Sequence, residues 1–186
     1  MNRREAVQYI SILLGGTLVG GNVFLSGCKS ETGVSMVFTE DDVKLLDEIA
    51  DTILPTTKTP GAKAAKTGQF MTVMVNDCYE EKDQKIFHEG MKKLNDLSKK
   101  TYDASFVTIN PQQRHDLLVK LDNEQKDYMK NKKEGEPSHY FRMMKELTLL
   151  GYFTSKIGCT QARRYFETPG RYDADIPYKK GDKAFA

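Results

Sequence analysis

Residues 140–158 read YFRMMKELTLLGYFTSKIG, and this stretch decides the fold. Its apolar residues would cover nearly every side of a helix, and Ser138 is the predicted N-cap. A helix that is apolar all round either lies at the centre of a bundle or packs against another protein, and the sequence leaves both roles open. The apolar residues are Tyr140, Phe141, Met143, Met144, Leu147, Leu149, Leu150, Tyr152 and Phe153.

Two helices are predicted at the start of the folded region. Thr39 is the predicted cap of the first helix, which ends at Pro55 and turns an apolar stripe inward. That stripe is Val43, Leu46, Ile49 and Ile53. After a loop around Pro60 and Gly61, the second helix is expected to place Phe70, Val73, Met74 and either Asp77 or Cys78 on one side.

Two more helices precede the central one. Residues 82–102 form the third predicted helix, with Ile86, Phe87, Met91, Leu94 and Leu97 facing inward. Asn110, Pro111 and Gln113 combine an N-cap, a first-turn proline and a capping-box glutamine, so they predict the start of the fourth. The fourth helix is expected to bury Leu117, Leu118, Leu121 and Tyr128.

The fold class predicted from these segments is all-α, because no alternating strand pattern of useful length interrupts them. We expect an irregular bundle of about five helices in a single domain over residues 38–186. From about residue 160 the chain has no helical period and becomes an extended tail rich in aromatic residues. Disordered segments are poor in aromatic residues, so we expect the tail to pack on its own bundle or on a partner.

The first 27 residues have the features of an export signal. Arg3 and Arg4 precede a moderately apolar, glycine-rich segment, and the pair partly matches a twin-arginine signal for folded cargo; a general secretory signal is the other reading. Residues 25–28 read LSGC, which resembles a bacterial lipobox in which Cys28 is lipidated. Residues 28–37 then form a polar tether, and the acyl chains predict a lasting membrane anchor rather than a span.

Charge and motifs exclude several functions. The chain has 28 Lys and Arg against 26 Asp and Glu, a net charge of +2, so no basic face for nucleic acid is expected. No glycine-rich phosphate loop follows a predicted strand. The three histidines fall on different predicted elements without metal-ligand spacing. We therefore expect no catalytic residue, no metal and no cofactor in this chain.

Two cysteines, Cys78 and Cys159, remain after the lipidation site. Outside the cytoplasm such a pair can oxidise to a disulfide if the fold brings the two Cα atoms within about 7 Å. Free buried thiols are the alternative, and the sequence does not decide between them.

Three runs of residues carry a family resemblance. Ile49 to Pro55 read IADTILP and are followed by Thr59, Pro60 and Gly61; Gly151 to Ser155 read GYFTS, and Pro169 to Tyr172 read PGRY. In this order and spacing the chain resembles the gluconate 2-dehydrogenase subunit 3 family from Phe38 to Tyr178.

The resemblance implies an accessory subunit of a membrane-associated dehydrogenase on the periplasmic face of the bacterial cell envelope. In such complexes a larger flavoprotein of the glucose-methanol-choline type carries FAD and oxidises a sugar or sugar acid, and a cytochrome can take the electrons. The small subunit supplies the export signal and a docking surface. Lys29 after Cys28 favours the outer membrane.

The stretch from Tyr140 to Tyr178 supplies the Tyr, Phe, Met and Arg residues that protein interfaces prefer. The residues expected to bind the partner are Tyr152, Phe153, Tyr165, Phe166, Arg171 and Tyr172. The alternative is a stand-alone envelope lipoprotein that binds a ligand or assists assembly, which predicts a stable monomer with a ligand pocket.

Overall fold

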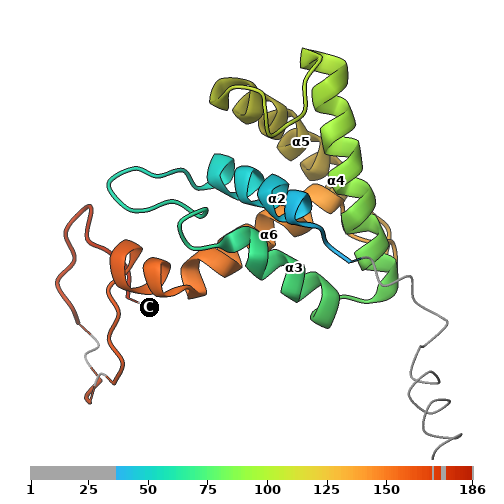
Figure 1. Ribbon diagram of the computed structural model, residues 1–186. Helices are drawn as coiled ribbons and strands as arrows, with labels where there is room; N and C mark the ends of the chain where they lie inside the picture. Colours follow the sequence, from blue (N-terminus) through green and yellow to red (C-terminus); the bar gives the residue numbers. More distant parts are fainter. Residues whose placement is uncertain (1–36, 169, 173–174, 186) are drawn as a thin grey trace, which may run out of the picture. The chain divides into compact units, whose positions relative to one another are not determined.

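A computed structural model describes residues 37–168, 170–172 and 175–185, which form a set of helices followed by a non-helical tail (Figure 1). No strand occurs in these residues, so the predicted all-α class is confirmed. The predicted export residues Arg3 and Arg4 and the predicted lipidation site Cys28 lie outside the described residues. The elements are α2 (Glu40–Ile53), α3 (Thr67–Cys78), α4 (Glu81–Tyr102), α5 (Pro111–Asn131), α6 (Tyr140–Thr154) and the π-helical turn η1 (Gly158–Ala162).

Two helices begin where their sequences predict. The Thr39 hydroxyl accepts a hydrogen bond from the Asp42 N–H at 3.2 Å, and the Asp42 carboxylate accepts one from the Thr39 N–H at 2.9 Å. Asn110 and Gln113 form the same reciprocal pair at the start of α5, on either side of Pro111. Each capping box satisfies backbone donors that a helix start otherwise leaves without partners. Local sequence is therefore sufficient to set these two helix starts.

The buried face of α3 differs from the prediction. Val73 is 52% exposed and Cys78 is exposed, whereas the helix buries Thr67, Gly68, Met71, Thr72 and Val75. Gly68 sets this rotation, because its N–H donates to the Asp47 carboxylate of α2 at 2.8 Å. A Cβ at position 68 would lie 2.6 Å from that carboxylate, so only glycine fits there. The side of α3 that carries Gly68 therefore packs on α2, while Phe70 and Met74 of the predicted face are half-buried against the core.

Smaller differences occur on α2, α4 and α5. In α2 the buried residues are Leu45, Leu46, Ile49 and Ala50, while Val43 and Ile53 are half-buried. In α4, Phe87, Met91 and Leu94 are buried as predicted, with Ile86 and Leu97 at the edge of the core. In α5, Leu117, Leu118 and Leu121 are buried, but Tyr128 is exposed and its hydroxyl donates to the Pro137 carbonyl at 3.0 Å.

Helix α6 is central, because it contacts α2, α3, α4 and α5 (Figure 1). Most of its apolar residues are in the core, but Leu149 and Leu150 remain exposed, so it is not buried on every side. Its N-cap is His139 rather than the predicted Ser138. The His139 Nδ1 accepts a hydrogen bond from the Phe141 N–H at 3.2 Å, a contact that a neutral histidine can make in place of a hydroxyl.

The C-terminal end of α6 meets the loop between α2 and α3. The Tyr152 hydroxyl donates to the Pro60 carbonyl at 2.7 Å, across 92 positions of sequence. Gly61 lies so close to the end of α2 that a Cβ there would come within 2.9 Å of the Asp51 carboxylate and 2.6 Å of the Thr56 nitrogen just beyond the helix. Two of the sequence runs that carry the family resemblance therefore pack together and have structural roles in the helical body.

Candidate docking surface

The tail after η1 carries most of the exposed aromatic residues of the described chain. Tyr165 and Phe166 are 55% and 56% exposed, Tyr178 is 74% exposed and Tyr172 is 91% exposed. Water contact at several large apolar side chains on one short segment is unfavourable, and such segments usually mark an interaction site. The tail is therefore the candidate docking surface of the described residues.

The residues predicted to bind a partner divide into two groups. Tyr152 is only 4% exposed and bonds to Pro60, so it belongs to the core rather than to a surface. Phe153 is half-buried at the end of α6, with the Arg163 guanidinium 4.5 Å from the centre of its ring. Tyr165, Phe166, Arg171 and Tyr172 are all exposed in the tail. Tyr152 is therefore the buried member of the predicted set, although it is the sequence neighbour of the half-buried Phe153.

Further exposed apolar residues were not among the predicted partner contacts. Ile176 and Tyr178 flank Pro177 in the tail and are exposed. The apolar and aromatic composition of the tail sequence could have identified them as candidate contacts. Leu150 on α6 and Val73 on α3 are exposed on two helices that pack against each other. The sequence placed Val73 on the inward side of its helix and left the role of the helix that carries Leu150 open, so the structure is what identifies both as surface residues.

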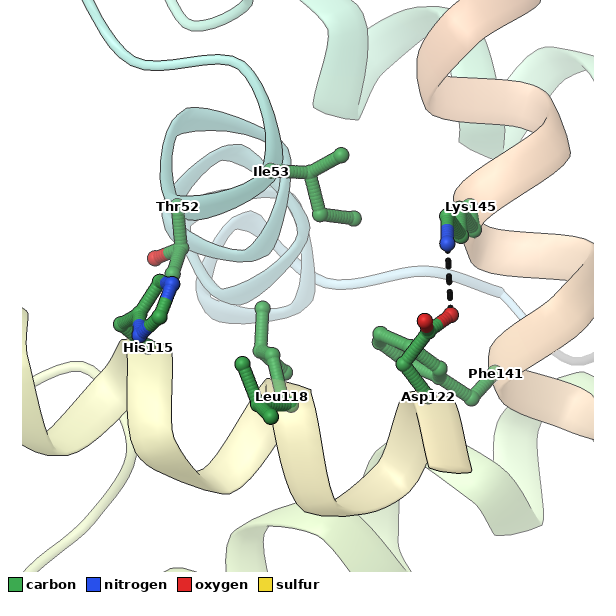
Figure 2. Close-up of a pocket in the computed structure, with 8 residues that line it drawn as sticks. Thr52, Ile53, His115, Leu118, Asp122, Phe141 and Lys145 are labelled. Atoms are coloured by element: carbon green, nitrogen blue, oxygen red, sulfur yellow. Dashed lines mark hydrogen bonds and ion pairs between the residues drawn. The ribbon is translucent and has the colours of Figure 1, made fainter. Parts of the chain in front are cut away.

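A separate hollow of about 220 Å³ lies between α2, α5 and α6 (Figure 2). Ile53, Leu118 and Phe141 supply its apolar wall, and Thr52 and His115 lie at its edge. Sites for small molecules usually measure about 300 to 1,000 Å³, so this hollow is small for a sugar or a cofactor.

The charged groups at the hollow are already paired. The Asp122 carboxylate accepts hydrogen bonds from the Lys145 and Lys126 ammonium groups, each at 2.6 Å, and from the Gln125 amide at 3.2 Å. Burial acts to raise the pKa of Asp122, but these hydrogen bonds outweigh it and lower the pKa to about 2. A carboxylate with so low a pKa stays ionised near neutral pH and is poorly suited to act as a general base there.

The histidines are dispersed over the helices. His139 caps α6, and burial lowers its pKa while nearby Glu124 opposes that shift. His115 is exposed beside Asp116, and His88 stacks on Phe38 with the ring centres 4.1 Å apart. In the described part of the chain, no group of three or more histidine, cysteine or carboxylate residues is arranged to hold a metal ion.

Both cysteines are free thiols in this structure. Cys78 is exposed at the end of α3, and the Cys159 thiol in η1 donates to the Phe153 carbonyl at 3.3 Å. In this structure no disulfide joins these two residues, which lie on α3 and in η1. Among the helices described, none has the length and apolar content needed to cross a bilayer.

Comparison with known proteins identifies a family. The family model for gluconate 2-dehydrogenase subunit 3 matches residues 40–170. The match includes the five α-helices, η1 and the first part of the tail. No curated protein and no solved structure matches the chain.

Proposed function

Because the chain belongs to the gluconate 2-dehydrogenase subunit 3 family, we propose that it is the non-catalytic small subunit of a sugar or sugar-acid dehydrogenase complex in the bacterial cell envelope. Its partner is a larger FAD-dependent subunit of the glucose-methanol-choline type, and a cytochrome is a further candidate member of the complex. The FAD and the catalytic residues belong to the large subunit.

The observation that carries this proposal is the exposed aromatic tail beside a helical body whose core is already formed. Tyr165, Phe166 and Tyr172 make a surface of the residue types that interfaces prefer. Because the core does not need these rings, a second protein that covers them would gain the free energy of burying their apolar area. Docking through the tail therefore fits a subunit that binds rather than catalyses.

The N-terminal segment supplies the remaining roles in this proposal. Arg3 and Arg4 direct export, and lipidated Cys28 anchors the complex to a membrane on the periplasmic side, with the outer membrane favoured by Lys29. Since this chain has no recognisable cofactor motif of its own, a folded-export signal serves the flavoprotein that is carried with it. The export signal and the docking surface are therefore two parts of one function.

Capture from envelope membranes tests the docking role. An affinity tag is inserted after Gly135, an exposed loop residue with open space around it, so that both ends of the chain stay native. After gentle solubilisation the wild-type chain should recover a large protein with a flavin absorbance spectrum. Recovery of the chain alone would refute the proposed function.

Matched triple variants locate the docking site. The tail variant Tyr165→Ser, Phe166→Ser, Tyr172→Ser should lose the flavoprotein. The control variant Val73→Ser, Val119→Ser, Leu150→Ser removes exposed apolar residues from three helices and should retain it. Loss in the control variant with retention in the tail variant would move the docking site to the helices.

Fractionation tests export and anchoring. Replacing Arg3 and Arg4 by lysine should leave the flavoprotein in the cytoplasm, and Cys28→Ser should release the complex from membranes without blocking export. Normal export of the flavoprotein with the lysine variant would contradict the role of the arginine pair.

The hollow in Figure 2 and a second hollow of about 500 Å³, whose lining includes Tyr79, Lys82 and Glu146, favour a stand-alone ligand-binding lipoprotein. That function predicts a monomer whose thermal stability rises with sugars or sugar acids. The small volume of the hollow in Figure 2, its internally paired Asp122 and Lys145, and the family match make this function the second candidate.

A further inference from the structure

The last described residues, 183–185, fold back onto the start of the tail. The Arg164 N–H donates to the Ala184 carbonyl at 2.8 Å, and its guanidinium Nε donates to the Lys183 carbonyl at 2.8 Å. The same guanidinium lies 4.2 Å from the centre of the Phe185 ring. The Lys183 ammonium donates to the Gln161 carbonyl in η1. We call these five residues, Gln161, Arg164, Lys183, Ala184 and Phe185, the clasp.

The clasp is attached to the helical body through the residue before Arg164. The Arg163 N–H donates to the Gly158 carbonyl at 3.0 Å, and its guanidinium covers the Phe153 ring at the end of α6. Figure 1 shows the chain leaving the end of the last helical segment, and the final described residues return to it at Arg164. The tail is thus a loop closed at its base, rather than a free end.

The described residues 165–168, 170–172 and 175–182 lie between the two halves of the clasp, and we call them the arm. Near its end the arm makes a tight turn, in which the Lys179 N–H donates to the Asp182 carboxylate at 2.9 Å and the Asp182 N–H donates to the Lys179 carbonyl at 3.0 Å. Gly181 allows this turn with a φ of +98°. The exposed rings of Tyr165, Phe166, Tyr172 and Tyr178 belong to the arm. The clasp therefore holds together the segment that carries the candidate docking surface.

We propose that the clasp holds the arm as a preformed loop for docking on the larger dehydrogenase subunit, and that Arg164 and Phe185 act as positioning residues. This inference rests on the proposed function, and the family's membership of a dehydrogenase complex identifies the occupant. Closing a loop lowers chain entropy, and a loop that is closed before binding does not lose that entropy on binding. Opening the clasp should therefore weaken the complex even when every arm residue is intact.

The first test opens the clasp by substitution. Arg164→Ala and Phe185→Ala should each raise the dissociation constant for the flavoprotein recovered with the wild-type chain, by roughly tenfold. The constant is measured on the full lipidated chain in detergent by biolayer interferometry. Thermal unfolding of the helical body should be unchanged, because both residues contact the tail rather than the core.

The second test closes the loop covalently without the clasp side chains. Arg164 and Phe185 are bridge partners, and neighbouring extended segments lie about 5 Å apart, so cysteines at both positions can form a disulfide. Arg164→Cys with Phe185→Cys is made in a background with Cys78→Ser and Cys159→Ser, and it is oxidised with glutathione disulfide. Oxidised protein should bind as tightly as wild type, and the same sample after reduction should bind roughly tenfold more weakly.

Each outcome of these tests has a definite meaning. Equal binding by wild type, Arg164→Ala and Phe185→Ala would overturn the inference and leave the proposed function standing. Weak binding by both the oxidised and the reduced cysteine variant would also overturn it, because Arg164 and Phe185 would then act through direct contact with the partner. A wild-type chain that recovers no flavoprotein would overturn the proposed function and this inference together.

Discussion

Helix α6 and the tail that follows it both carry several aromatic residues, but their environments are opposite. Tyr140, Phe141 and Tyr152 of α6 are buried, whereas Tyr165, Phe166 and Tyr172 of the tail are exposed. In α6 the rings recur at helical spacing, so four neighbouring helices can cover them. The tail has Pro169, Gly170 and Pro177 and no period, so no helical face gathers its rings. Spacing, rather than aromatic content, separates a core segment from a docking segment.

The largest expected effect concerns the interior of α6. Phe141→Ala should lower the free energy of unfolding by about 3 to 5 kcal/mol, because it removes a buried ring and leaves a cavity between helices. Urea denaturation followed by circular dichroism measures the change. A loss below about 1 kcal/mol would contradict the assignment of α6 as the core helix.

The second effect concerns the ion pairs of Asp122, of which the pair with Lys145 joins α5 to α6. At pH 7, Asp122→Asn should lower the free energy of unfolding by about 2 kcal/mol, because the folded-state pKa of Asp122 is about 2 and the ordinary value is 3.8. A lowered pKa contributes stability above the unfolded value and loses it as pH falls through the folded value. The difference between variant and wild type should therefore shrink between about pH 4 and pH 2.

The control for Asp122 is Asp116→Asn. Asp116 is more than half exposed, so this substitution should change unfolding by less than about 0.5 kcal/mol. A difference between Asp122→Asn and wild type that stays constant from pH 7 to pH 2 would show that the ion pairs are not its cause.

The third effect concerns the contact between α6 and the loop at Pro60. Tyr152→Phe removes the hydroxyl that donates to the Pro60 carbonyl and should lower the free energy of unfolding by about 1 kcal/mol. Tyr128→Phe is the matched control, because its hydroxyl also donates to a proline carbonyl but at an exposed position, and it should change unfolding by a few tenths of a kcal/mol. Equal effects would mean that burial adds nothing to this hydrogen bond.

The sequence predicts the helical body well where local signals are strong. Thr39 and Asn110 mark helix starts because a side chain three residues away completes each capping box. Phe87, Met91 and Leu94 are correctly assigned to the core because their helix packs along one clear stripe. Local chemistry settles these features before any tertiary contact forms.

Prediction fails where distant contacts decide the outcome. The rotation of α3 depends on how Gly68 packs on Asp47 of α2. The spacing of apolar residues within α3 does not predict that contact. The burial of Tyr152 depends on Pro60, and the closure of the tail depends on Arg164 meeting Phe185, across long stretches of sequence. Of the candidate docking residues, the exposed tail rings follow from composition, but the exclusion of Tyr152 requires the fold.

The smallest effect on stability should come from the tail, whose rings are exposed where those of α6 are buried. Tyr172→Ala should change the unfolding of the isolated chain by less than about 0.5 kcal/mol, because the ring is 91% exposed and contributes nothing to the core. The large subunit should raise the apparent stability of the wild-type chain, because a partner that binds only the folded state shifts the unfolding equilibrium. With Tyr172→Ala that rise should be smaller, since binding through the arm is weakened. Thermal unfolding with and without the recovered flavoprotein measures both quantities. Equal stabilisation of the two chains would mean that Tyr172 lies outside the interface.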